Sequence, residues 1–294
     1  MSITVPAASL DHREDRNFTS FPNSSYIFPS DDREKERLRN QHFFWRRVFG
    51  GRILFAPIML QPTDVVLESG AGSGIWLLDI AKEVPASVTL HGIDIESNLF
   101  PELHPENIHF SISSVTTLPH EWTNKFTLVH QRLLIGALKK SEWPTALQEI
   151  HRVLAPGGWV QLFESAGREA GPCLARMRAM ASALYASRGQ VGDIISRHLP
   201  LILPELGFIN VTTEEREQPS GTWAGKEGIE GKKNIIDLYI AMKPAILKAG
   251  GFGIINSEQG YDDLLEALGK ELDETMGAFQ RACVVYAQKP VAVK

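Results

Sequence analysis

The 294-residue chain contains 43% apolar and 22% charged residues, proportions typical of a globular protein with a sizeable core. Its net charge of −5 gives no overall attraction to phosphate backbones, which argues against a nucleic-acid-binding protein. Only Cys173 and Cys283 occur, without histidines at metal-ligand spacing, so neither a disulfide framework nor a metal site is predicted.

Residues 1–22 carry scattered polar residues without periodicity, and we expect a flexible leader there. The leader lacks the apolar core of a secretory signal. No apolar run in the chain approaches the roughly 18 residues needed to cross a bilayer. The expected location is therefore the cytoplasm, without membrane association.

A helix is predicted next, over DDREKERLRNQHFFWRRVFGGRIL from Asp31 onward. Acidic residues lie early in this segment, basic residues lie late, and Gly50 and Gly51 provide a stop. We assign it to an N-terminal helical cap over residues 23–60.

The middle of the chain alternates short apolar segments with helical patterns, the order typical of a parallel sheet covered by helices. Region 61–165 is the predicted ligand-binding core. Its expected strands are 64–69, 88–93, 108–112, 126–130 and 159–164, and its expected helices are 75–84 and 141–154.

After Glu164 the pattern becomes mainly helical, and residues 166–294 are expected to complete the same domain. The Gly-rich stretch 219–231 is predicted to be a mobile loop or lid. The expected helices are 172–188, a segment ending at Glu205, 232–249 and 260–277, and the expected strands are 208–214 and 282–288. The predicted fold is a Rossmann-like α/β fold, with a seven-stranded, mostly parallel sheet, helices on both faces and a helical insert before the last strands.

The sharpest local signal is VVLESGAGSGIWLLDIA, in which an apolar strand, three alternating glycines and a helix follow one another. Backbone N–H groups at such a turn can approach a ligand closely. A dinucleotide fingerprint would need a glycine where Ile75 stands, and no P-loop lysine follows. A ligand with an adenosine and a small charged end remains, as does the alternative of a tight turn without a ligand.

Asp94 follows the second predicted strand, in GIDIES. A carboxylate at this strand end can accept hydrogen bonds from both ribose hydroxyls. The alternative is that Asp94 caps a following helix, a role that Ser97 could also fill.

These segments, taken together, resemble class I S-adenosylmethionine-dependent methyltransferases, and most closely the fungal small-molecule and secondary-metabolism group that includes the global-regulator type. The resemblance covers nearly the whole chain and implies S-adenosylmethionine as cofactor. The matching segments, in chain order, are YIFPSDDREKERLRNQH, VVLESGAGSGIW, GIDIES, FTLVHQRLLIGAL and EIHRVLAPGGWVQLFE.

The resemblance implies that Glu68, Gly70 and Gly72 surround the methionine part of the cofactor. It also implies that Asp94 holds the ribose, with Ile95 beside it. Glu68 stands where aspartate is commoner in the family.

At the adenine edge, the resemblance implies contacts from Ser114 and Val115. The family usually carries aspartate before the small residue. Ser114 keeps a hydrogen-bonding group without the charge, so we expect a weaker or differently arranged adenine contact.

His130 ends the fourth predicted strand on the side where open α/β sheets bind ligands, and it is the candidate general base. The alternative is that it packs beside the cofactor or contributes only its backbone. Arg132 is a candidate partner for a carboxylate of the cofactor, with a structural salt bridge as the alternative. The resemblance also places Tyr26 and His42 in a segment that folds over the cofactor, although packing of an N-terminal helix explains them equally well.

Residues after the fifth strand are expected to form the acceptor pocket, in which Met and aromatic side chains suit a flat, apolar substrate. A core role is the alternative for the methionines. The candidates are Glu164, Met177, Met180, Tyr185, Trp223 and Tyr239.

The predicted reaction is methyl transfer to a small molecule, with oxygen of a secondary metabolite as the first acceptor and nitrogen or carbon behind it. Two alternatives remain open. One is a cofactor-binding regulatory protein that acts through a protein partner. The other is a cyclase on the same fold, since fold does not fix function.

Overall fold

The computed structural model describes residues 26–291, so the predicted leader at residues 1–22 lies outside the described part. The strands are β1 (Val65–Ser69), β2 (Thr89–Asp94), β3 (Ile108–Ile112), β4 (Phe126–Arg132), β5 (Leu154–Glu169), β6 (Ile209–Pro219) and β7 (Phe279–Gln288). The helices are α1 (Asp32–Val48), α2 (Ile75–Ile80), α3 (Glu142–Val153), α4 (Pro172–Ser187), α5 (Ile195–Glu205), α6 (Gly225–Lys248) and α7 (Glu258–Glu274).

The seven strands form one sheet in the order β3-β2-β1-β4-β5-β7-β6. The five neighbouring strands β3, β2, β1, β4 and β5 run parallel to one another, whereas β7 is antiparallel to both β5 and β6. The predicted seven-stranded, mostly parallel sheet is therefore confirmed. The strand order reverses between β1 and β4, where open α/β sheets leave a crevice at the carboxyl ends of their strands.

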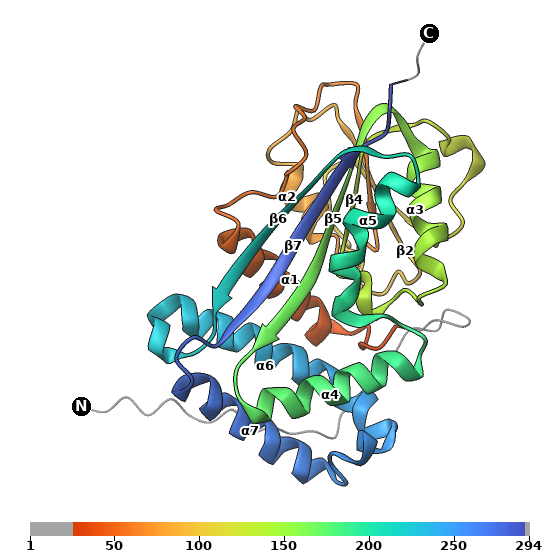
Figure 1. Ribbon diagram of the computed structural model, residues 1–294. Helices are drawn as coiled ribbons and strands as arrows, with labels where there is room; N and C mark the ends of the chain where they lie inside the picture. The colour runs from red at the N-terminus through yellow and green to blue at the C-terminus, as the bar shows by residue number, and fades with distance from the viewer. Residues whose placement is uncertain (1–25, 292–294) are drawn as a thin grey trace.

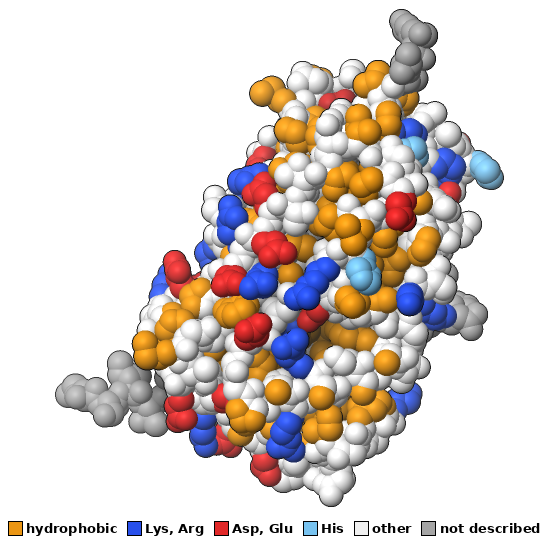
Figure 2. All heavy atoms as spheres, in the orientation of Figure 1, with side chains coloured by type: hydrophobic (Ala, Val, Ile, Leu, Met, Phe, Trp, Pro, Cys, Tyr) orange, Lys and Arg blue, Asp and Glu red, His pale blue; other side chains and the backbone are white. Residues whose placement is uncertain are grey.

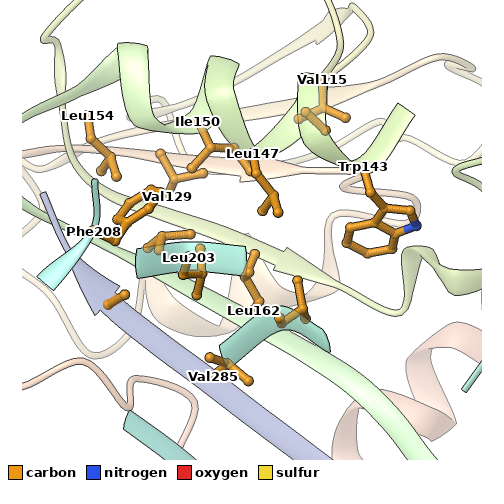
Figure 3. Packing of buried hydrophobic residues seen from close by; sticks show 14 of the residues in the cluster. Val115, Val129, Trp143, Leu147, Ile150, Leu154, Leu162, Leu203, Phe208 and Val285 are labelled. Atoms are coloured by element: carbon orange, nitrogen blue, oxygen red, sulfur yellow. The ribbon is translucent and has the colours of Figure 1, made fainter. Parts of the chain in front are cut away.

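Helices α3 and α5 cover one face of the sheet through a continuous apolar core. Figure 3 shows Leu147 of α3 and Leu203 of α5 directed toward Leu162 of β5 and Val285 of β7. Helix α2 packs on the opposite face, where Trp76 and Leu77 are buried. Both faces are covered, which explains why most of the buried positions on these strands carry apolar side chains.

Helices α4, α6 and α7 form a separate helical layer at one end of the long strands β5, β6 and β7 (Figure 1). This layer has its own apolar core. Met177 and Met180 are fully buried in it, together with Tyr239 of α6.

The prediction of a mobile loop at 219–231 is wrong, because α6 begins at Gly225. Its glycines serve close packing: a Cβ on Gly228 would lie 2.0 Å from the Gly221 carbonyl oxygen, and one on Gly231 would lie 2.1 Å from that of Pro219. Glycine here lets the helix touch the preceding chain, a role that composition does not distinguish from flexibility.

Charged side chains of both signs are interspersed with apolar ones on the face shown in Figure 2. Within residues 26–291, no helix is both long and apolar enough to span a membrane.

Candidate functional site

A cavity of about 430 Å³ lies at the carboxyl ends of the parallel strands. Segments that follow β1, β2, β3 and β4 form its walls, α1 covers it, and the end of β5 with α4 and α6 closes the far side. Of the residues predicted to bind the cofactor, those that line the cavity are Tyr26, Gly70, Gly72, Asp94, Ile95, Ser114, Val115 and Arg132.

The turn after β1 has the left-handed backbone that glycine adopts without strain, with φ of +66° at Gly70 and +52° at Gly72. A Cβ on Gly70 would lie 2.7 Å from a methyl carbon of Leu134. Glycine thus brings the turn against the segment after β4, and both segments line the cavity.

Asp94 lies at the end of β2 and faces the same cavity. Its carboxylate accepts hydrogen bonds from the N–H groups of Gly72 at 2.8 Å and Glu96 at 3.2 Å. Burial raises the pKa of Asp94, while these backbone donors lower it. Among the described residues no helix starts directly after β2, so the helix-cap alternative does not apply.

Ser114 and Val115 form a side wall of the cavity. The Ser114 hydroxyl lies 2.8 Å from that of Thr116 and accepts a hydrogen bond from the Thr116 N–H at 3.2 Å. Ser114 therefore offers a hydrogen-bonding hydroxyl to this wall of the cavity.

Glu68 lies beneath the Gly-rich turn and does not line the cavity. It is fully buried and lacks a close hydrogen-bond partner, and its nearest cation is the Arg132 Nε at 3.8 Å. Burial raises the pKa of Glu68 to about 8, although Arg132 lowers it. With a pKa of about 8 the carboxyl group is mainly protonated at pH 7, and a ligand that brings a positive charge above the turn would favour its ionised form.

Arg132 separates the main cavity from a smaller one of about 30 Å³ and lines both. It donates a hydrogen bond to His42 Nδ1 at 2.7 Å, and His42 Nε2 lies 2.8 Å from Asp79. Arg46 also pairs with Asp79. His42 therefore connects α1 to α2 and to the cavity wall, and it does not line the main cavity.

Helix α1 also contributes directly to the cavity. Its buried Glu34 holds Arg37 by two hydrogen bonds, at 2.6 and 2.7 Å, so that Arg37 lines the cavity beside Tyr26. Burial, together with the Glu34 carboxylate, raises the pKa of Tyr26 well above its ordinary value, so the phenol is neutral.

His130 lies in the smaller cavity, outside the main one. Its ring stacks on Trp76 with centroids 4.0 Å apart, and its Nδ1 accepts from the Gln161 amide at 3.1 Å. Burial lowers its pKa well below the ordinary value, with Arg132 and His42 adding to the effect. This placement favours the packing alternative over the general-base hypothesis.

The expected acceptor residues are mostly outside the main cavity. Glu164 lies behind the wall, where it accepts from the Leu134 N–H at 2.9 Å. Met180 and Tyr239 belong to the helical core, and Trp223 lies on the surface at 37% exposure. Of the six candidates, only Tyr185 lines the cavity.

Much of the wall that follows β4, and Arg168 at the end of β5, line the cavity without having been predicted from the sequence. The first group could have been found, since every segment that follows a parallel strand reaches the same edge of the sheet. The missed residues include Leu38, Gln41, Leu133, Leu134, Ile135, Leu138, Lys139, Glu142 and Arg168.

A family model described as a methyltransferase domain matches residues 66–158. The chain is 31% identical over 281 residues to N-methyltransferase sirN of Leptosphaeria maculans, with coverage of 92% of this chain and 96% of the relative. It is 30% identical over 292 residues to N-methyltransferase gliN of Aspergillus fumigatus, with coverage of 92% and 100%.

One solved structure, the complex between the Haloferax volcanii Trm112 methyltransferase activator and a methyltransferase, matches with a TM-score of 0.52. The match covers 89% of this chain and 96% of that chain at 12% identity, so it shows a likeness of fold. The fold, the glycine turn facing Asp94 and the full-length relatives agree: the chain belongs to the class I S-adenosylmethionine-dependent methyltransferases, in their fungal small-molecule group, and its cofactor is S-adenosylmethionine.

Proposed function

We propose that this enzyme transfers a methyl group to a nitrogen atom of a small molecule of fungal secondary metabolism. The observation that carries the proposal is the position of His130, whose ring is stacked on Trp76 outside the cavity that the Gly-rich turn and Asp94 line. A hydroxyl acceptor benefits from a base that removes its proton, whereas a neutral nitrogen offers its lone pair directly. The names of the relatives, both N-methyltransferases, point the same way.

S-adenosylmethionine supplies, when bound, a methyl group made electrophilic by the positively charged sulfur. The chain's part is then to bind, orient and exclude water. Asp94 would hold the ribose, the backbone of the glycine turn would surround the methionine part, and Arg37 and Arg132 would provide two cations for the cofactor's carboxylate. Leu38 and Gln41 of α1 cover the cavity and limit the access of water.

Calorimetric titration with S-adenosylmethionine and S-adenosylhomocysteine tests the cofactor, and micromolar binding is expected for both. The protein is next incubated with cofactor labelled with ¹³C in its methyl group and with extracts of a fungus that produces secondary metabolites. The carbon chemical shift of the labelled product distinguishes an N-methyl from an O-methyl group. An O-methyl product would show that the methylated atom is oxygen and not nitrogen. A failure to bind either form of the cofactor would overturn the proposal.

A further inference from the structure

Strand β5 breaks its regular alternation where it reaches the cavity. Ser165 and Arg168 both line the cavity, although residues three apart on a regular strand point to opposite faces. The register with β7 shifts between Ser165 and Gly167, and Gly167 has a φ of +121°. Such a bulge redirects the side chains that follow it. This irregularity turns Arg168 into the cavity.

The guanidinium of Arg168 is only partly satisfied by the protein. Its side chain is 13% exposed, Nη2 donates to the Ser165 hydroxyl at 3.1 Å, and Nη1 lies 3.6 Å from the Asp193 carboxylate. Its Nε is buried without a hydrogen-bond partner. Because the side chain lines the cavity and keeps some exposure, a ligand oxygen there would accept a hydrogen bond from the guanidinium donors that the protein leaves unpaired.

The charged side chains at this end of the cavity are of both signs. Asp193 offsets Arg168, and Glu142, which accepts from the Lys139 backbone N–H at 2.7 Å, lines the cavity together with Lys139. Burial lowers the pKa of Arg168 but Asp193 raises it, and the net shift is upward, so the guanidinium remains charged. A carboxylate ligand would add an uncompensated negative charge, whereas an uncharged oxygen would not.

Apolar side chains line the same cavity as Arg168, contributed by Ile135, Leu138, Leu238 and the ring of Tyr185. A mostly apolar pocket with one oriented polar group is the usual design of a small-molecule site. The matching ligand has an apolar body and one carbonyl-type oxygen.

We propose that Arg168 binds a carbonyl oxygen of the methyl acceptor and thereby selects uncharged, carbonyl-bearing molecules. The inference rests on the proposed function, because it assigns this end of the cavity to the acceptor. Arg168 is then the residue that orients the acceptor toward the cofactor.

Three probes of similar size test the proposal: acetophenone, which has a carbonyl, ethylbenzene, which lacks it, and benzoate, which carries a charge. Their binding to the protein saturated with S-adenosylhomocysteine is measured by ligand-observed NMR. In the wild type, acetophenone should bind at least fivefold more tightly than either other probe. Arg168→Met should remove this preference and leave ethylbenzene unchanged, and Arg168→Lys should retain part of it.

Arg197→Met is the matched control, since it removes an exposed arginine from α5 and should keep the preference. Equal binding of acetophenone and ethylbenzene, tightest binding of benzoate, absence of all probe binding, or an unchanged preference in Arg168→Met would each overturn the inference. Titration with S-adenosylhomocysteine distinguishes a failure of the proposed function from a failure of the role assigned to Arg168. If the wild type fails to bind it, the proposed function fails; if all variants bind it while the probe pattern is absent, only the role of Arg168 fails.

Discussion

Arg132 and His42 are joined by a hydrogen bond of 2.7 Å that links the cavity wall to α1. The same imidazole lies 2.8 Å from Asp79 of α2 through its other nitrogen. The ring therefore accepts from Arg132 and donates to Asp79, which requires the neutral form. Seating of α1 over the cofactor cavity thus depends on an uncharged histidine between a cation and an anion.

This arrangement predicts a pH dependence of stability. Burial, with Arg132 as a second cause, lowers the pKa of His42 from 6.5 to about 4. Because the unfolded chain binds a proton at higher pH than the folded one, the free energy of unfolding should fall as pH drops from about 6.5 to about 4. Urea unfolding at several pH values in this range measures the fall.

His42→Gln should flatten that part of the profile, because glutamine does not titrate. His91, whose pKa burial also lowers to about 4, is present in both proteins and cancels in the comparison. Profiles that stay parallel in the wild type and the variant would show that His42 does not contribute.

Asp94→Ala is expected to weaken binding of S-adenosylhomocysteine by at least tenfold. The substitution removes the charged acceptor proposed for the ribose hydroxyls, and hydrogen bonds to charged groups contribute about 1.5–3 kcal/mol. Calorimetric titration measures the affinity, with Glu96→Ala as a control at a neighbouring carboxylate that also lines the cavity. If Asp94→Ala binds as tightly as the wild type, the ribose assignment is incorrect.

The strands and the glycine turn could be predicted because their signals are local. Short apolar runs indicate buried parallel strands, and Gly70, Gly72 and Gly74 lie between such a run and a helix that begins at Ile75. Arg168 could not be predicted, since its direction depends on a bulge in β5 that no composition signal marks. The prediction of Met180 as a pocket residue is not supported, because a methionine at helical spacing fits a protein core equally well. The packing of α4 against α6 and α7 places Met180 in the core.

His130→Gln should leave the turnover number within a few-fold of the wild type and lower the melting temperature. The ring is stacked on Trp76 and lines the smaller cavity, outside the main one, so its loss affects packing. Removing a true general base would instead slow turnover by roughly 10²-fold or more. Such a loss with an unchanged melting temperature would restore the general-base hypothesis.

Glu164 is expected to support the cavity wall from behind. Its carboxyl group accepts from the Leu134 N–H, and Leu134 packs against Gly70 of the cofactor turn. Burial raises the pKa of Glu164 well above its ordinary value, while the backbone N–H groups of Leu134 and Ile135 lower it. Glu164→Gln, which keeps an accepting oxygen without charge, should retain affinity for S-adenosylhomocysteine, whereas Glu164→Ala should weaken it several-fold. Equal affinities in the two variants would argue against this support.

Gly228→Ala tests the finding that the glycines near the start of α6 serve packing and not mobility. A Cβ at this position would lie 2.0 Å from the Gly221 carbonyl oxygen, a contact that the backbone cannot relieve without moving apart. Overpacking of this kind typically costs about 1–3 kcal/mol. Gly269→Ala in α7 is the matched control, since the nearest atom to its Cβ is a flexible lysine carbon at 3.7 Å. Alanine there should be neutral or stabilising, because it favours the helix by up to about 1 kcal/mol. Chemical denaturation of both variants separates packing from mobility: a lid would tolerate either alanine, whereas the packed helix tolerates only the one in α7.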